Sequence, residues 1–88
     1  MKTLVKVPLV LPYAVVELTL AKNAGELDSQ FHDVVDAENH ARYWSMKAKR
    51  PFAVVWRYGV LLLYEEGRLS KFDADWFSDL IEVRWVGN

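Results

Sequence analysis

The stretch FAVVWRYGVLLLY, residues 52–64, decides how the chain divides into helices and strands. Its dense valine, leucine and aromatic side chains are typical of β-structure. A single strand of 13 residues would be unusually long. We therefore predict two strands that turn at Gly59, with one long strand bulged at Gly59 as the alternative.

Upstream of this stretch, Pro51 predicts the end of a helix, because proline cannot continue one. Leu27, Phe31, Val34 and Val35 recur at helical spacing, which places the helix from about residue 26 to about residue 49. Residues 21–28, AKNAGELD, are interpreted as a turn.

The N-terminal residues predict two strands separated by a turn at Pro12. The first covers residues 3–11 and the second residues 14–21. The apolar faces that alternation predicts are Val5, Val7, Leu9 and Leu11 on the first strand, and Ala14, Val16, Leu18 and Leu20 on the second.

Downstream, EEGR at 65–68 predicts a tight turn, and residues 69–72 a short strand. Asp73 can cap a short helix over 74–80, ADWFSDL, by accepting hydrogen bonds from its first free amides. IEVRWV at 81–86 alternates apolar and charged residues and predicts a final strand.

This order of elements predicts the α+β class. We expect residues 1–88 to form one small domain, with a mostly antiparallel sheet, the long helix packed on one face and a short second helix near the C-terminus. A chain of 88 residues with 52% apolar residues has the length and composition of a single globular domain.

The composition excludes several classes of protein. There is no cysteine, which removes disulfide frameworks, zinc ribbons, thiol nucleophiles and iron–sulfur clusters and suits the cytoplasm. The apolar N-terminal run is interrupted by Lys6, Pro8, Pro12 and Glu17, so we interpret it as strand and not as a signal peptide. No run has the roughly 18 apolar residues of a membrane span.

His32, Asp36 and His40 are spaced four residues apart, and all three are metal-ligand types. On the predicted helix they share one face, opposite the stripe of Leu27 and Phe31. A metal site needs converging ligands and partners that orient the imidazoles, which one exposed helix does not supply. We therefore predict a solvated polar face without metal or cofactor, and keep the three residues as the alternative metal site.

The second half of the helix carries a displaced apolar stripe, formed by Ala37, Ala41, Trp44 and Ala48. Glu38 and Arg42 fall on the buried side of the wheel, four residues apart, and predict a partly buried ion pair. A polar pocket is the alternative interpretation of these two residues.

Charge is segregated along the chain, although the net charge is only −1. From Asn39 to Tyr64 there is no acidic residue, and aromatic residues accompany five cations: Arg42, Lys47, Lys49, Arg50 and Arg57. Cations with stacking rings can serve nucleic acid. The simpler interpretation of the helical cations is that they meet the negative end of the helix dipole.

The C-terminal segment reverses the sign. Asp73 and Asp75 suit the first turn of a helix, or an acidic surface with Trp76 as an anchor for a basic partner. The candidate partner-binding residues are Tyr43, Lys47, Lys49, Arg50, Arg57, Tyr58, Asp73, Asp75 and Trp76.

Catalytic signatures are missing from the sequence. None of the serines stands in a G-x-S-x-G turn, and the four glycines are scattered. We expect a non-enzymatic protein that binds another protein, such as a regulator or an inhibitor of the kind that phages direct against host complexes. The alternatives are a nucleic-acid-binding module using residues 42–58, a homodimer that pairs the segregated charges, and last a small metal-dependent or interfacial enzyme.

Overall fold

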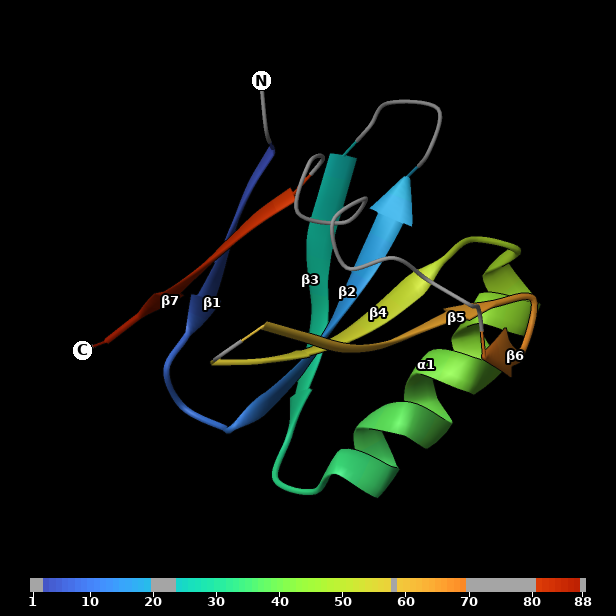
Figure 1. The fold of residues 1–88 in the computed structure, drawn as a ribbon, viewed down its shortest axis with the longest axis horizontal. Helices are drawn as coiled ribbons and strands as arrows, with labels where there is room; N and C mark the ends of the chain where they lie inside the picture. Colours follow the sequence, from blue (N-terminus) through green and yellow to red (C-terminus); the bar gives the residue numbers. More distant parts are fainter. Residues whose placement is uncertain (1–2, 20–23, 58, 70–80, 88) are drawn as a thin grey trace.

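The computed structural model describes residues 3–19, 24–57, 59–69 and 81–87 of the chain (Figure 1). Within these ranges the elements are β1 (Thr3–Pro8), β2 (Tyr13–Thr19), β3 (Ala24–Phe31), α1 (Val34–Ala48), β4 (Phe52–Trp56), β5 (Gly59–Glu65), β6 (Arg68–Leu69) and β7 (Ile81–Val86). The α+β class, the antiparallel sheet and the helix packed on it are confirmed.

The main sheet has five strands in the order β3-β2-β4-β5-β6, and each neighbouring pair is antiparallel. Its centre is the pairing of β2 with β4, in which Val15 lies opposite Val54 and Val16 opposite Ala53. All four of these residues are fully buried. Because successive side chains point to opposite faces of a strand, both faces of this sheet require cover.

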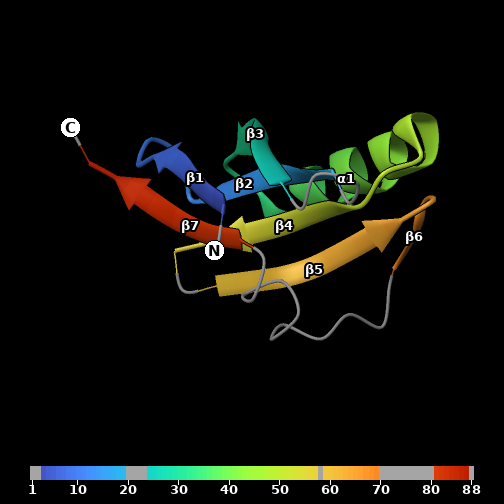
Figure 2. The same cartoon turned by 90° about the horizontal axis from the view of Figure 1, so that it is seen from above.

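The helix α1 covers one face. Ala37 and Ala41 of the helix pack with Val15, Val54 and Phe52 of the sheet in one apolar cluster. The small alanine side chains let the helix axis lie close to the strands. Figure 2 shows α1 and the β1–β7 pair on opposite sides of β2 and β4.

The other face is covered by a two-stranded sheet of β1 and β7, which the sequence did not predict. These strands are parallel, with Thr3 beside Ile81 and Val7 beside Trp85, so segments from the beginning and end of the sequence lie side by side (Figure 1). The second apolar cluster joins these strands to the sheet, and its buried members are Val5, Val7, Ala14, Val16, Leu18, Ala53, Val55, Leu63 and Ile81.

The predicted start of the helix is wrong. Residues 26–31 belong to β3, and α1 begins at Val34, where the Asp33 carboxylate accepts a hydrogen bond of 2.7 Å from the Val35 amide. Leu27 packs against the β1–β7 side of the sheet and Phe31 against the α1 side, so their four-residue spacing does not reflect one helical stripe. Val35 is 54% exposed.

The predicted turn at AKNAGELD is also wrong over its described residues, because Gly25 lies within β3. A Cβ atom at this position would stand 2.9 Å from Ile81 Cδ1 and 3.4 Å from Leu18 Cδ2. A glycine inside a strand commonly marks such a close approach. Gly25 therefore lets β7 pack against β3.

The second helical stripe is largely correct. Ala37, Ala41 and Ala48 face the sheet, together with Ser45, whereas Trp44 remains 44% exposed. The predicted pairing of Glu38 with Arg42 is not formed. Arg42 Nη2 instead donates a 2.6 Å hydrogen bond to Asn39 Oδ1.

Several local predictions are confirmed. The stretch 52–64 forms two strands, β4 and β5, and EEGR forms the turn before β6, with Glu66 and Gly67 at φ values of 50° and 78°. IEVRWV forms β7, with Ile81 buried and Glu82 and Arg84 exposed. The first predicted strand ends earlier, at Pro8. The predicted short helix over 74–80 and its cap Asp73 lie outside the described residues.

Ser45 is the polar side chain that joins α1 to the β5–β6 turn. It is fully buried, accepts a 2.9 Å hydrogen bond from the Gly67 amide and donates one of 2.9 Å to the Arg42 carbonyl. Among the described residues, no buried side-chain nitrogen or oxygen atom lacks a hydrogen-bond partner. A single hydroxyl group thus links the turn to the helix.

We expect Ser45→Ala to destabilise the protein. Leaving the half-buried Gly67 amide without its acceptor costs about 1–3 kcal/mol, and the better helix propensity of alanine recovers about 0.5 kcal/mol. The free energy of unfolding, measured by urea denaturation, should fall by about 1–2 kcal/mol with an unchanged m-value. Lys47→Ala, at an exposed helix position, is the control and should change it by less than about 0.5 kcal/mol. Equal stability of Ser45→Ala and the wild type would contradict the role of this hydroxyl.

Burial raises the pKa of Tyr64 above its usual 10.0, the charge of Glu38 raises it further, and Arg42 lowers it. The neutral phenol is therefore favoured in the folded state. This stabilisation is complete below pH 10 and is lost as the pH rises from there through the raised pKa, because the unfolded chain ionises first.

The free energy of unfolding should accordingly fall more steeply above pH 10 for the wild type than for Tyr64→Phe, which cannot ionise. Urea denaturation of both proteins between pH 8 and pH 11 measures the difference, and other titrating groups cancel in the comparison. Parallel curves would show that Tyr64 ionises equally easily in the two states.

Candidate functional site

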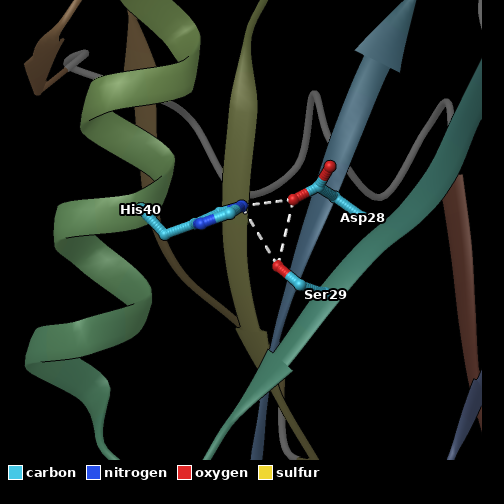
Figure 3. A network of polar contacts seen from close by, with 3 residues as sticks. All are labelled: Asp28, Ser29 and His40. Atoms are coloured by element: carbon cyan, nitrogen blue, oxygen red, sulfur yellow. Dashed lines mark hydrogen bonds and ion pairs between the residues drawn. The ribbon is translucent and has the colours of Figure 1, made fainter.

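Asp28 and Ser29 of β3 and His40 of α1 converge at the junction of the sheet and the helix (Figure 3). Ser29 Oγ donates a 3.0 Å hydrogen bond to Asp28 Oδ2 and lies 3.1 Å from His40 Nε2. His40 Nε2 also contacts Asp28 Oδ2 directly. We refer to these three residues as the polar trio.

A β-bulge makes this convergence possible. Adjacent residues of a regular strand point to opposite faces, but the register between β2 and β3 shifts here. Val15 pairs with Ser29 and Val16 pairs with Leu27, which leaves Asp28 as the extra residue. A bulge of this kind redirects a side chain, so Asp28 and Ser29 both reach the face that α1 covers.

The polar trio does not have the geometry of an activated serine nucleophile. In that arrangement the carboxylate holds one ring nitrogen, and the other nitrogen accepts the serine proton. Here Asp28 and Ser29 both contact Nε2. Since the Ser29 proton is directed to Asp28, we assign the Nε2 proton to His40, which donates to the two oxygens. The trio therefore ties β3 to α1.

A row of aromatic rings continues from the polar trio along α1. The His40 ring lies 5.0 Å from Phe31 and 6.3 Å from Trp44, centroid to centroid. Trp44 meets Tyr43 edge to face at 5.3 Å, and Lys47 Nζ lies 5.6 Å from the centre of the Tyr43 ring. These spacings are those of favourable ring pairs and of a cation–π contact.

The row leads to an exposed surface on the C-terminal half of α1. Tyr43 is 50% exposed, Trp44 44% and Met46 51%. Lys47 is exposed beside them. We call these four residues the α1 outer face. Large apolar side chains gathered at one exposed place are typical of contact surfaces.

The predicted candidate residues do not all lie on this surface. Tyr43, Lys47, Lys49 and Arg50 lie close in sequence at the end of α1 and are exposed, and Arg50 forms an ion pair with Glu17 of β2. Arg57 follows the last residue of β4, at the opposite end of that strand from Lys49 and Arg50. Five strand residues span about 17 Å. Tyr58, Asp73, Asp75 and Trp76 lie outside the described residues.

The alignment of His32, Asp36 and His40 on one helix is wrong, because His32 lies in the bend before α1. Asp36 is exposed, whereas His40 is turned to the polar trio. In the part of the chain that the structure describes, no three His, Cys, Asp or Glu side chains are grouped to hold a metal ion. In the same part of the chain, no helix has the length and apolar content of a membrane span.

An exposed hollow of about 490 Å³ lies between the end of α1 and the β5–β6 turn. Its lining residues are Lys49, Arg50, Pro51, Glu65, Glu66, Arg68 and Leu69. Charges of both signs are therefore present within this hollow, in contrast to the α1 outer face.

Sequence reasoning missed Trp44, Met46 and Asp28 as members of a site. The helical spacing of Trp44 from Ala41 and Ala48 predicts a core position for it, and the predicted helix from residue 26 includes Asp28. Asp33 is a strong N-cap residue that directly precedes Val34 and Val35. It could have placed the start of the helix at residue 34, which would have left residues 26–31 to a strand.

No protein-family model matches the chain, and neither curated proteins nor solved structures show a significant match to it.

The polar trio should contribute a measurable coupling between β3 and α1. In a double-mutant cycle of Asp28→Ala and His40→Ala, we expect a coupling energy of about 0.5–1 kcal/mol, because the two groups are in contact and partly exposed. Unfolding in urea supplies the four free energies. Glu82→Ala with His40→Ala is the control, because Glu82 is exposed on β7, on the other side of the sheet, and its partner is Arg84; this pair should couple by less than about 0.3 kcal/mol. Equal coupling in both cycles would argue against the trio.

Proposed function

We propose that this protein is a non-enzymatic binding module that contacts a partner protein through the α1 outer face. The observation that carries the proposal is the exposure of Tyr43, Trp44 and Met46 on one helix whose alanine side chains face the core. The helix packs through its small residues, so its large ones are available for contact.

The chemistry of this surface suits a protein partner. Tyrosine, tryptophan, methionine and arginine are enriched in the cores of protein interfaces, and a few such residues carry most of the binding energy. Tyr43 is held between Trp44 and Lys47. Side chains that are already ordered lose less conformational entropy on binding.

The arrangement of cations favours a protein partner over nucleic acid. Lys49 and Arg50 precede β4, Arg57 follows it at the opposite end, and Arg50 is paired with Glu17. A nucleic-acid site would depend on several cations tracking one phosphate backbone. Nucleic-acid binding therefore remains the second hypothesis.

A module of this kind acts by occupying its partner, and we assign it the role of a regulator or inhibitor. The cysteine-free chain suits a reducing compartment, so we place this action in the cytoplasm.

We expect the tagged wild-type protein to capture a stoichiometric partner protein from a lysate of the encoding organism, with nuclease present. Tyr43→Glu combined with Met46→Glu should lose this partner, because each substitution places a charge at the centre of the apolar contact. Mass spectrometry of the captured material, quantified against the bait, measures the loss.

Val35→Glu is the matched control, since Val35 is 54% exposed on the first turn of the same helix. It should retain the partner, and circular dichroism should show all three proteins folded. A catch that disappears with nuclease would transfer the function to nucleic acid. Capture by the double variant would remove the α1 outer face from the interface.

A further inference from the structure

An open hollow of about 380 Å³ lies beside the α1 outer face, between the helix and the β5–β6 turn. It is lined by Asn39, Arg42, Tyr43, Met46 and Gly67. Its volume is at the low end of pockets that hold small ligands, which suits one or two side chains of a bound segment.

The hollow is a fixed feature of the fold. Ser45 holds the Gly67 amide and the Arg42 carbonyl at 2.9 Å each, which fixes the turn against the helix. Residue 67 adopts a φ of 78°, and a Cβ there would stand 3.2 Å from Met46 Cβ. Glycine satisfies both requirements, and without a side chain it leaves space beside Met46.

The walls of the hollow combine apolar surface with one sign of charge. Met46 and the Tyr43 ring supply the apolar surface. The Arg42 guanidinium is anchored by Asn39 Oδ1 at 2.6 Å, which leaves most of its donors for another acceptor. No carboxylate is among the described lining residues, and Lys47 lies one turn beyond Tyr43.

Carboxylates occur nearby but are placed elsewhere. Glu65 and Glu66 line the neighbouring hollow together with Lys49 and Arg68. Glu38, one turn before Arg42, is half-buried and acts on Tyr64. The described residues that line the 380 Å³ hollow therefore carry positive charge and no negative charge.

We infer that this hollow receives an acidic segment of the partner protein, which inserts one apolar or aromatic side chain against Met46 and Tyr43 and places a carboxylate on Arg42. The inference rests on the proposed function and gives its partner a chemistry. A planar guanidinium can bind a carboxylate through two parallel hydrogen bonds, which gives direction as well as affinity.

The test uses random dodecapeptides displayed on a carrier and selected against the immobilised full chain. Enriched peptides should carry net negative charge and at least one Trp, Phe or Leu. A synthetic copy should bind the wild type, and its Kd should rise at least about tenfold with Arg42→Glu and with Met46→Asp. Arg42→Lys should weaken binding by a smaller factor, because the charge remains and the paired geometry is lost.

Arg57→Glu is the matched control, an equal charge reversal at an exposed arginine beyond the far end of β4, and should leave the Kd within about twofold. Binding that falls equally in both reversals would reduce the effect to net charge and overturn the inference. Basic or neutral winning peptides, or no enrichment, would overturn it as well.

These outcomes are distinct from failure of the proposed function, which the lysate capture tests independently. A captured partner lost from Tyr43→Glu with Met46→Glu, combined with peptides that ignore Arg42, would keep the module and reject the acidic segment. Winning peptides that match this chain, together with a dimer in sedimentation, would identify a second copy as the occupant and overturn a foreign partner.

Discussion

The structure depends on the pairing of β2 with β4, two strands that are buried on both faces. Val15 and Val54 point to one side and Val16 and Ala53 to the other, and none of the four is accessible to solvent. An antiparallel sheet often leaves one face in water, but this one cannot. The covering elements are placed by that requirement: α1 covers one face, and β1 with β7 covers the other.

The same constraint shapes the candidate site. The helix approaches the sheet through Ala37 and Ala41, which need little space, so the rings of Tyr43 and Trp44 add to the outside of the domain instead of its core. Two polar features hold this helix in register, the polar trio on its β3 side and Ser45 on its β5–β6 side. The helix that carries the aromatic surface is therefore held by polar contacts on both of its sides.

Local signals in the sequence predicted much of this fold, but contacts between residues distant in the sequence could not be predicted from them. The division of residues 52–64 at Gly59 and the turn at 65–68 follow from the usual length of a strand and from turn chemistry. The pairing of Thr3 with Ile81 has no local signature. The bulge at Asp28 places Leu27 and Phe31 on opposite faces of β3, so their four-residue spacing, which also suits a helix, does not report a shared face. Exposure of Trp44 depends on how closely the alanines dock, which spacing alone cannot determine.

The parallel pairing of β1 with β7 also has a consequence for how the protein folds. Contacts between residues so distant in sequence form only after a large loop closes, and folding slows as such contacts increase. Until β7 arrives, the face carrying Ala14, Val16 and Leu18 is incompletely covered. A nascent chain that still lacks β7 exposes apolar surface on this face, and exposed apolar surface promotes aggregation. During synthesis, the domain is therefore prone to aggregation until β7 docks on this face.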